Sequence, residues 1–154
     1  MHSSLVFPYG ITLNEGGIVN IFPAAEVQCE SREGGWLSLF FVIDSGAVIS
    51  ALPMSDASSL GIVPETGISM HMKGIGREMI MGWKHEIGVR VGEEKIRLPI
   101  AFLDSSPRIL GRAGIFDRFT IVFEEDQRRT GFLGKGTKES KAMKNILEKV
   151  RKST

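Results

Sequence analysis

One long apolar run that ends in a carboxylate restricts the fold more than any other stretch of the sequence. Residues 36–43, Trp-Leu-Ser-Leu-Phe-Phe-Val-Ile, are rich in aromatic and β-branched side chains and predict a strand that is buried on both faces. Asp44, Ser45, Gly46 and Ala47 follow directly. A carboxylate in this position is costly unless hydrogen bonds hold it, and a glycine turn can aim backbone N–H groups at it. An ordinary Asp turn is the alternative, because Asp, Ser and Gly are all common in turns.

Length and composition indicate a soluble protein with one core. The chain has 154 residues, of which 42% are hydrophobic and 24% charged, as in ordinary globular domains. Nineteen basic and eighteen acidic residues leave a net charge of +1, so the overall charge favours neither nucleic acid nor a membrane surface as a partner. The single Cys29 excludes an intramolecular disulfide. Without a secretory signal or an apolar run of membrane-spanning length, we expect a cytoplasmic protein.

Short strands joined by turns account for most of the remaining sequence. Pro53 is expected to open a short helix over residues 54–60, which Gly61 ends, and a helical turn is expected at 113–117. Residues 1–17 suggest no regular element. Beside the run already described, strands are expected within 18–29 (with an edge or bend at Pro23), 48–52, 68–72, 79–91, 96–102, 109–112, 119–123 and up to 133. This pattern predicts an all-β, barrel-like domain.

The C-terminal tail differs in character from the rest. Gly134-Lys135-Gly136 marks a break, so we expect a domain over residues 1–133 and a tail over 134–154. Lysines cover most of the tail, and its apolar residues share one helical face. These are Ala142, Met143, Ile146, Leu147 and Val150. We predict a basic amphipathic helix that packs on the body or on a partner chain.

The hairpin expected between residues 68 and 83 has an unusual tip. Its strands alternate apolar and polar residues, and Lys73-Gly74-Ile75-Gly76-Arg77 holds one isoleucine between two glycines. A hairpin of this kind suits a lid that opens for an extended chain and then excludes water. Its four methionines offer an adaptable apolar surface, although core packing is the expectation for at least two of them.

Several kinds of chemistry find no support in the sequence. His2, His71 and His85 lack metal-ligand spacing, and Cys29 has no nearby basic residue to activate it, so neither a metal site nor a cysteine nucleophile is expected. Gly74-Ile75-Gly76 begins like a dinucleotide fingerprint, but the last glycine is missing and the segment lies in a hairpin. We therefore expect no metal and no cofactor.

The carboxylate turn, the glycine-tipped hairpin and an Ile-Leu-Gly segment, in this order, resemble the retropepsin-like aspartic proteases. This family comprises the retroviral proteases and their cellular single-domain relatives. The matching stretches are residues 42–47 with Ser50 and Leu52-Pro53, then 60–62, 74–76, 109–112 and 116–119. The resemblance covers roughly residues 18–133 and leaves the tail unexplained.

The resemblance implies a closed β-fold in which Asp44 is the catalytic carboxylate. Ser45 then replaces the more common threonine, and its hydroxyl bonds to the other subunit's loop. Gly46 and Ala47 line the floor of the substrate cleft.

The other matching segments have implied roles around the same cleft. Gly74, Ile75 and Gly76 would form a flap that closes over the peptide. Ile109 would be a subsite wall, and the segment 109–111 would pass beneath the catalytic loop and support it.

Three features depart from the retroviral pattern. Retroviral members carry an acid shortly after the alanine, which pairs with the arginine of the Gly-Arg pair, whereas this sequence has Val48 and Ile49. Arg112 then needs another partner, either Asp117 or a carboxylate of a second subunit. The flap is flanked by charged residues in place of further glycines, which implies a stiffer flap or a preference for acidic substrates. A helix also follows the last strand.

Carboxylate chemistry adds a requirement for a second copy. Peptide hydrolysis by carboxylates uses two of them that share one proton. The chain has one Asp-Ser-Gly, since Asp104 is followed by two serines, so a two-fold axis must supply the second. We predict an aspartic endopeptidase that is active as a homodimer on peptide substrates. The alternatives are a catalytically inactive dimerisation or peptide-binding module of the same fold and a β-barrel subunit of a complex.

Overall fold

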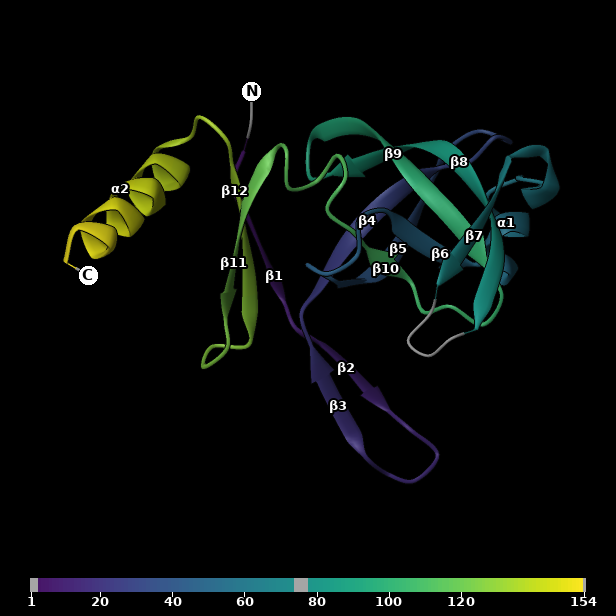
Figure 1. Ribbon diagram of the computed structural model, residues 1–154, viewed down its shortest axis with the longest axis horizontal. Coiled ribbons are helices and arrows are strands. Elements are labelled where there is room, and N and C mark those ends of the chain that lie inside the picture. Colours follow the sequence, from purple (N-terminus) through teal and green to yellow (C-terminus); the bar gives the residue numbers. More distant parts are fainter. Residues whose placement is uncertain (1–2, 74–77, 154) are drawn as a thin grey trace.

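Residues 3–73 and 78–153 are described by the computed structural model (Figure 1), and strands dominate them. The large sheet contains β4 (Ala24–Glu30), β5 (Trp36–Ile43), β6 (Ser50–Pro53), β7 (Ile68–Lys73), β8 (Met79–Val91), β9 (Glu94–Leu103) and β10 (Ile109–Leu110). Its order is β4-β5-β10-β6-β9-β8-β7, and β4 also pairs with β8. Strand β8 therefore has β7, β9 and β4 as hydrogen-bonded neighbours. The predicted all-β class is confirmed.

Two smaller sheets include strands within residues 1–17, for which the sequence suggested no regular element. A three-stranded sheet contains β1 (Leu5–Pro8), β12 (Arg129–Gly134) and β11 (Phe119–Glu124). A separate hairpin contains β2 (Gly10–Leu13) and β3 (Val19–Phe22). β1 pairs with β12 at the far end of the chain, so no local turn indicates it. Between β3 and β4, Pro23 makes the expected bend.

The core contains side chains of the large sheet together with Phe119 and Phe132 of the three-stranded sheet, and β5 contributes only one of its faces to it. Leu39, Phe41 and Ile43 are buried, whereas Phe40 is 66% exposed. The prediction that this strand is buried on both faces is therefore wrong. The described residues cover the opposite face of β5 only in part, because its partner strands lie beside β5 in the same sheet.

The helical predictions differ in outcome. α1 (Met54–Ser59) follows Pro53 as expected, and Gly61 after it has a φ of +63°, a conformation that favours glycine. A short 3₁₀ turn, η1 (Pro64–Thr66), was not expected. The expected turn at 113–117 is present, with hydrogen bonds from Phe116 N to the Arg112 oxygen and from Phe119 N to the Ile115 oxygen.

The tail forms the predicted helix, α2 (Lys138–Ser153), but it does not pack along the body. None of its described residues is buried, and Figure 1 shows the yellow helix attached near the end of β12. Its first turn is tied down by the Ser4 hydroxyl, which donates to Glu139 at 3.2 Å, and by a Thr120–Ser140 contact of 3.4 Å. No helix in the described part of the chain has the length and hydropathy needed to cross a membrane.

Candidate active site

Backbone N–H groups hold the Asp44 carboxylate at the end of β5. Gly46 N donates to Oδ1 of Asp44 at 2.8 Å, and Ala47 N donates to the same oxygen at 3.3 Å. A β-carbon at Gly46 would lie 3.2 Å from this oxygen, so the glycine permits a close approach of backbone and carboxylate. The half-buried Asp44 thus has the hydrogen bonds that its position after a core strand requires.

The segment 108–113 runs beside the Asp44 loop and holds it through hydrogen bonds. β10 lies between β5, to which it is parallel, and β6, to which it is antiparallel. The bonds run from Asp44 N to the Leu110 oxygen (3.0 Å), Arg112 N to the Ala47 oxygen (3.0 Å), Ala113 N to the Val48 oxygen (2.8 Å) and Gly111 N to the buried Ser50 Oγ (3.0 Å). The two sequence motifs, 44–47 and 109–112, therefore form one hydrogen-bonded unit.

Ile109 belongs to an apolar cluster close to this unit. It packs with Ala51, Ala101 and Leu103, and Met70 and Met72 of β7 pack on the same cluster. Met79 and Met81 of β8 are exposed instead. Two of the four methionines thus contribute to packing, and two remain on the surface.

Other sequence-predicted site residues have less support from contacts. Gly74, Ile75 and Gly76 lie outside the described residues, which end at Lys73 and resume at Glu78. Ser45 is exposed. In the described part of the chain no ion pair joins Arg112 to Asp117, whose Oδ2 accepts a hydrogen bond from Gly114 N at 3.1 Å. The predicted Arg112–Asp117 pair is therefore wrong, and a carboxylate of a second subunit stays a prediction.

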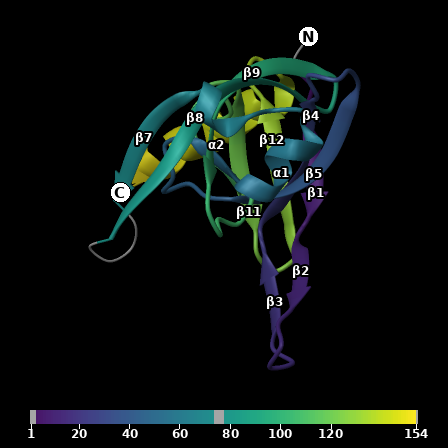
Figure 2. The same cartoon turned by 90° about the vertical axis from the view of Figure 1, so that its right-hand side faces the viewer.

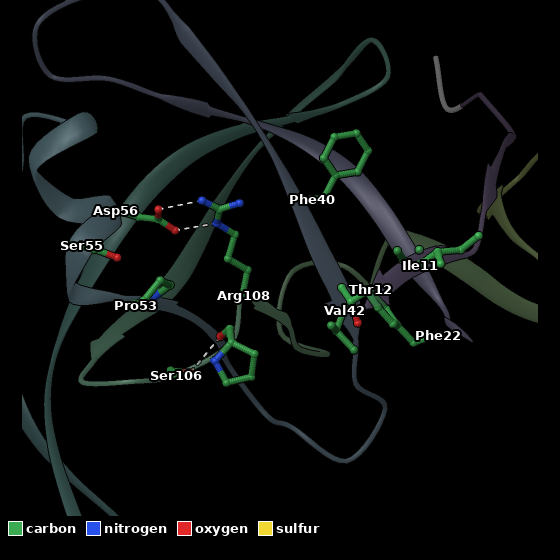
Figure 3. Close-up of a pocket in the computed structure, with 13 residues that line it drawn as sticks. Ile11, Thr12, Phe22, Phe40, Val42, Pro53, Ser55, Asp56, Ser106 and Arg108 are labelled. Carbon is green, nitrogen blue, oxygen red and sulfur yellow. Dashed lines mark hydrogen bonds and ion pairs between the residues drawn. The ribbon is translucent and has the colours of Figure 1, made fainter. Parts of the chain in front are cut away.

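A recess of about 600 Å³, which the sequence did not reveal, is lined by residues of α1, β5, the β2–β3 hairpin and the loop before β10 (Figure 3). One wall comes from the β2–β3 hairpin, through Ile11 and Phe22 among others, and the opposite wall from the loop before β10. Phe40 and Val42 form part of it with the exposed face of β5. These walls come from segments far apart in the chain, so no local pattern indicates the recess.

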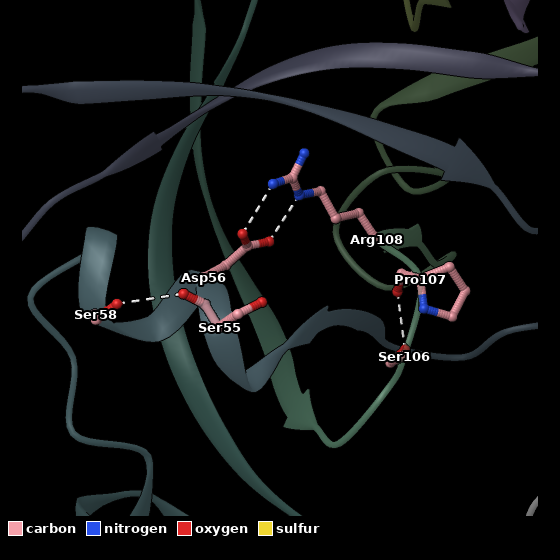
Figure 4. A network of polar contacts seen from close by, with 6 residues as sticks. All are labelled: Ser55, Asp56, Ser58, Ser106, Pro107 and Arg108. Carbon is pink, nitrogen blue, oxygen red and sulfur yellow. Dashed lines mark hydrogen bonds and ion pairs between the residues drawn. The ribbon is translucent and has the colours of Figure 1, made fainter. Parts of the chain in front are cut away.

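An ion pair ties α1 to the loop before β10, at the edge of the recess (Figure 4). Arg108 donates to both carboxylate oxygens of Asp56, at 2.7 and 2.8 Å. These hydrogen bonds raise the pKa of Arg108, so the guanidinium stays charged. The Asp56 side chain is only 10% exposed, and the pair therefore positions the chain that leads into Ile109.

Replacing Arg108 with methionine should lower the free energy of unfolding by about 2 kcal/mol, since it leaves a nearly buried carboxylate unpaired. The loss should be smaller than for a fully buried pair because the Arg108 side chain is 39% exposed. Arg129→Met is the matched control, because the Arg129–Glu124 pair lies at the surface, and it should change stability by less than about 1 kcal/mol. Urea unfolding of both variants is the measurement. Equal losses would contradict the assignment of a stabilising role to the Arg108–Asp56 pair.

Burial argues against the lone cysteine as a nucleophile. Cys29 is fully buried, and desolvation raises its pKa to about 12. A thiol in that state is protonated at neutral pH and does not attack substrates. The sequence-based rejection of Cys29 is therefore confirmed.

Comparison with known proteins supports the fold through structure alone. No protein-family model matches the sequence, and no curated protein matches it at a significant level. A retropepsin-like aspartic protease from Rickettsia conorii is similar, with a TM-score of 0.50 and 15% identity, over 86% of this chain and 91% of that one. EIAV protease in complex with the inhibitor HBY-793 gives a TM-score of 0.48 and 19% identity over 59% and 82%. The similarity to the Rickettsia protein covers most of both chains, and it shows that this chain has the retropepsin-like aspartic protease fold.

Proposed function

We propose that the protein is an aspartic endopeptidase that is active as a homodimer, with Asp44 of each copy in one catalytic pair. The observation that carries the proposal is the Asp44 loop in a retropepsin-like fold. Its carboxylate is fixed through Oδ1 by two backbone N–H groups. Oδ2 accepts no hydrogen bond from the residues that the structure describes and is free to share a proton with a second carboxylate.

The chemistry requires that second carboxylate. One carboxylate acts as a base on the attacking water while the other protonates the substrate carbonyl, so the pair works with one proton between them. Asp56 is engaged by Arg108, and Asp104 lies in an exposed loop. A symmetric dimer with its two-fold axis beside Asp44 supplies the missing group.

The surroundings of Asp44 fit an extended peptide as substrate. Gly46 is exposed and Ala47 is half-buried, and Ile109 adds an apolar wall. We assign the floor of the cleft to the first two and a subsite to the third. In this proposal the Ser45 hydroxyl bonds to the loop of the other subunit, and residues 74–76 close over the peptide.

A mixture of wild-type and Asp44→Asn subunits tests the proposal, because each chain brings one carboxylate. If dimers exchange at random, activity should fall as the square of the wild-type fraction. An equal mixture should then retain about a quarter of full activity, whereas independent subunits would retain about half. Mass-tagged chains and native mass spectrometry establish that subunits exchange.

A linear dependence with demonstrated exchange would show that Asp44 does not act across a dimer axis. A wild-type dimer that cleaves nothing in a diverse peptide library would favour the inactive peptide-binding module. These two outcomes can be told apart, because the linear dependence is observed only if the protein cleaves peptides, whereas the inactive module cleaves none.

A further inference from the structure

The β2–β3 hairpin stands away from both larger sheets and is apolar. Figures 1 and 2 agree that it projects from the body as a separate arm. Its large aliphatic side chains are between 43% and 71% exposed: Ile11, Leu13, Ile18, Val19 and Ile21. A surface of this kind on such a small element indicates a contact with another molecule.

The hairpin is ordered locally but is poorly protected from water. The Asn14 side chain closes its turn by accepting hydrogen bonds from Gly16 N at 3.1 Å and Ile18 N at 2.9 Å. β2 and β3 pair only with each other in the described part of the chain, so both strands have an open edge. Isolated two-stranded hairpins are marginally stable in water, and apolar open edges promote association unless a partner covers them.

The composition of the hairpin indicates what kind of surface covers it. Between Gly10 and Phe22 the only charged residue is Glu15, which lies in the turn. A strand pair without lysine or arginine has no cationic side chain to bind phosphates. It matches an uncharged, apolar protein surface.

The root of the hairpin lies beside the candidate catalytic residue. Ile43 N donates to the Pro23 oxygen at 3.0 Å, so the end of β3 is tied to the residue directly before Asp44. At the other end, Tyr9 N donates to the Arg128 oxygen at 2.8 Å. The ring of Phe22 lies over Gly10, where a β-carbon would come within 2.7 Å of it. The hairpin therefore leaves the body from a fixed base next to the site where the proposed two-fold axis passes.

We propose that the β2–β3 hairpin is a dimer arm, which packs its aliphatic side chains on the apolar surface around the Asp44 loop of a second copy of this chain. The inference rests on the proposed function, which places the second copy beside Asp44. The body offers a suitable surface, since Val48 is 63% exposed within the Asp44 loop and Phe40 is 66% exposed on β5. In a two-fold dimer the contact occurs twice and covers both arms.

The arm also connects dimerisation with the shape of the recess. Ile11 and Phe22 form one wall of this recess, whose lining includes Val42, two residues before Asp44. An arm that is held by the second copy fixes this wall, so the recess reaches its final shape only in the dimer.

A pair of double variants tests the arm. Ile11→Thr/Leu13→Thr removes apolar surface but keeps residues that favour strands, and it should raise the dimer dissociation constant at least about tenfold. Val63→Thr/Ile68→Thr is the matched control, because these two aliphatic residues are similarly exposed but lie away from the hairpin. It should leave the constant within about twofold. Sedimentation equilibrium gives both constants, and circular dichroism confirms folding.

Hydrogen exchange of the wild-type chain adds a measurement that needs no substitution. The amides of residues 10–22 should become protected as the concentration rises through the dimer dissociation constant. Equal dissociation constants for the two double variants, or unchanged exchange of residues 10–22 on dimerisation, would overturn the arm while leaving the homodimer in place. A wild-type chain that stays monomeric throughout would overturn the proposed function together with the arm.

Discussion

Asp44→Asn should abolish peptide cleavage and leave the fold intact. Asparagine keeps an oxygen that accepts from Gly46 N and Ala47 N, but it neither takes a proton from water nor gives one to the substrate. We expect the rate to fall at least about 10³-fold. Cleavage of a peptide library, together with circular dichroism of the variant, measures both parts of the prediction.

Asp104→Asn is the matched control, because Asp104 is an exposed aspartate outside the candidate site, and it should retain full activity. Wild-type activity should also decline towards alkaline pH, since the working pair carries one shared proton. Cleavage that persists in the Asp44→Asn variant would remove Asp44 from the mechanism.

Among conservative substitutions in the segment 108–113, Gly111→Ala should lower the stability of the protein the most. A β-carbon there would lie 2.4 Å from the carbonyl oxygen of Ile49 and 2.5 Å from its carbon. These are backbone atoms, so relief requires β10 and the Asp44 loop to separate. We expect a loss of about 3 kcal/mol in the free energy of unfolding, and a loss of cleavage in the protein that still folds.

Gly131→Ala provides the comparison within β12. The nearest atom to a β-carbon at Gly131 is 3.7 Å away, an ordinary contact, so its stability should change by less than about 1 kcal/mol. Urea unfolding and peptide cleavage of the two variants give the result. Similar stability for both would show that the backbone around Ile49 moves aside at little cost. The segment 108–113 would then not be tightly held against the Asp44 loop.

The candidate site was predictable in its parts because each part is a local motif. The turn after residue 43 follows from Asp-Ser-Gly, in which one side chain and its neighbouring N–H groups make the contacts. The start of α1 after Pro53 and the left-handed Gly61 follow from backbone restrictions of single residues. The tail helix follows from its periodicity. In each case the determining interactions lie within a few residues of chain.

The tertiary structure decided what depends on distant partners. β1 exists because β12 offers it an edge, and Phe40 is exposed because the described residues cover that face of β5 only in part. The pairing of Arg108 with Asp56 joins a loop to α1, and no local sequence pattern predicts it. The sequence by itself determined the turn after residue 43, most strands and both helices, through local hydrogen bonds and hydrophobic periodicity. The support of this turn by residues 109–111 was expected from the family resemblance. The recess and the free hairpin were decided by tertiary structure, because strand pairing and burial depend on which distant residues arrive beside them.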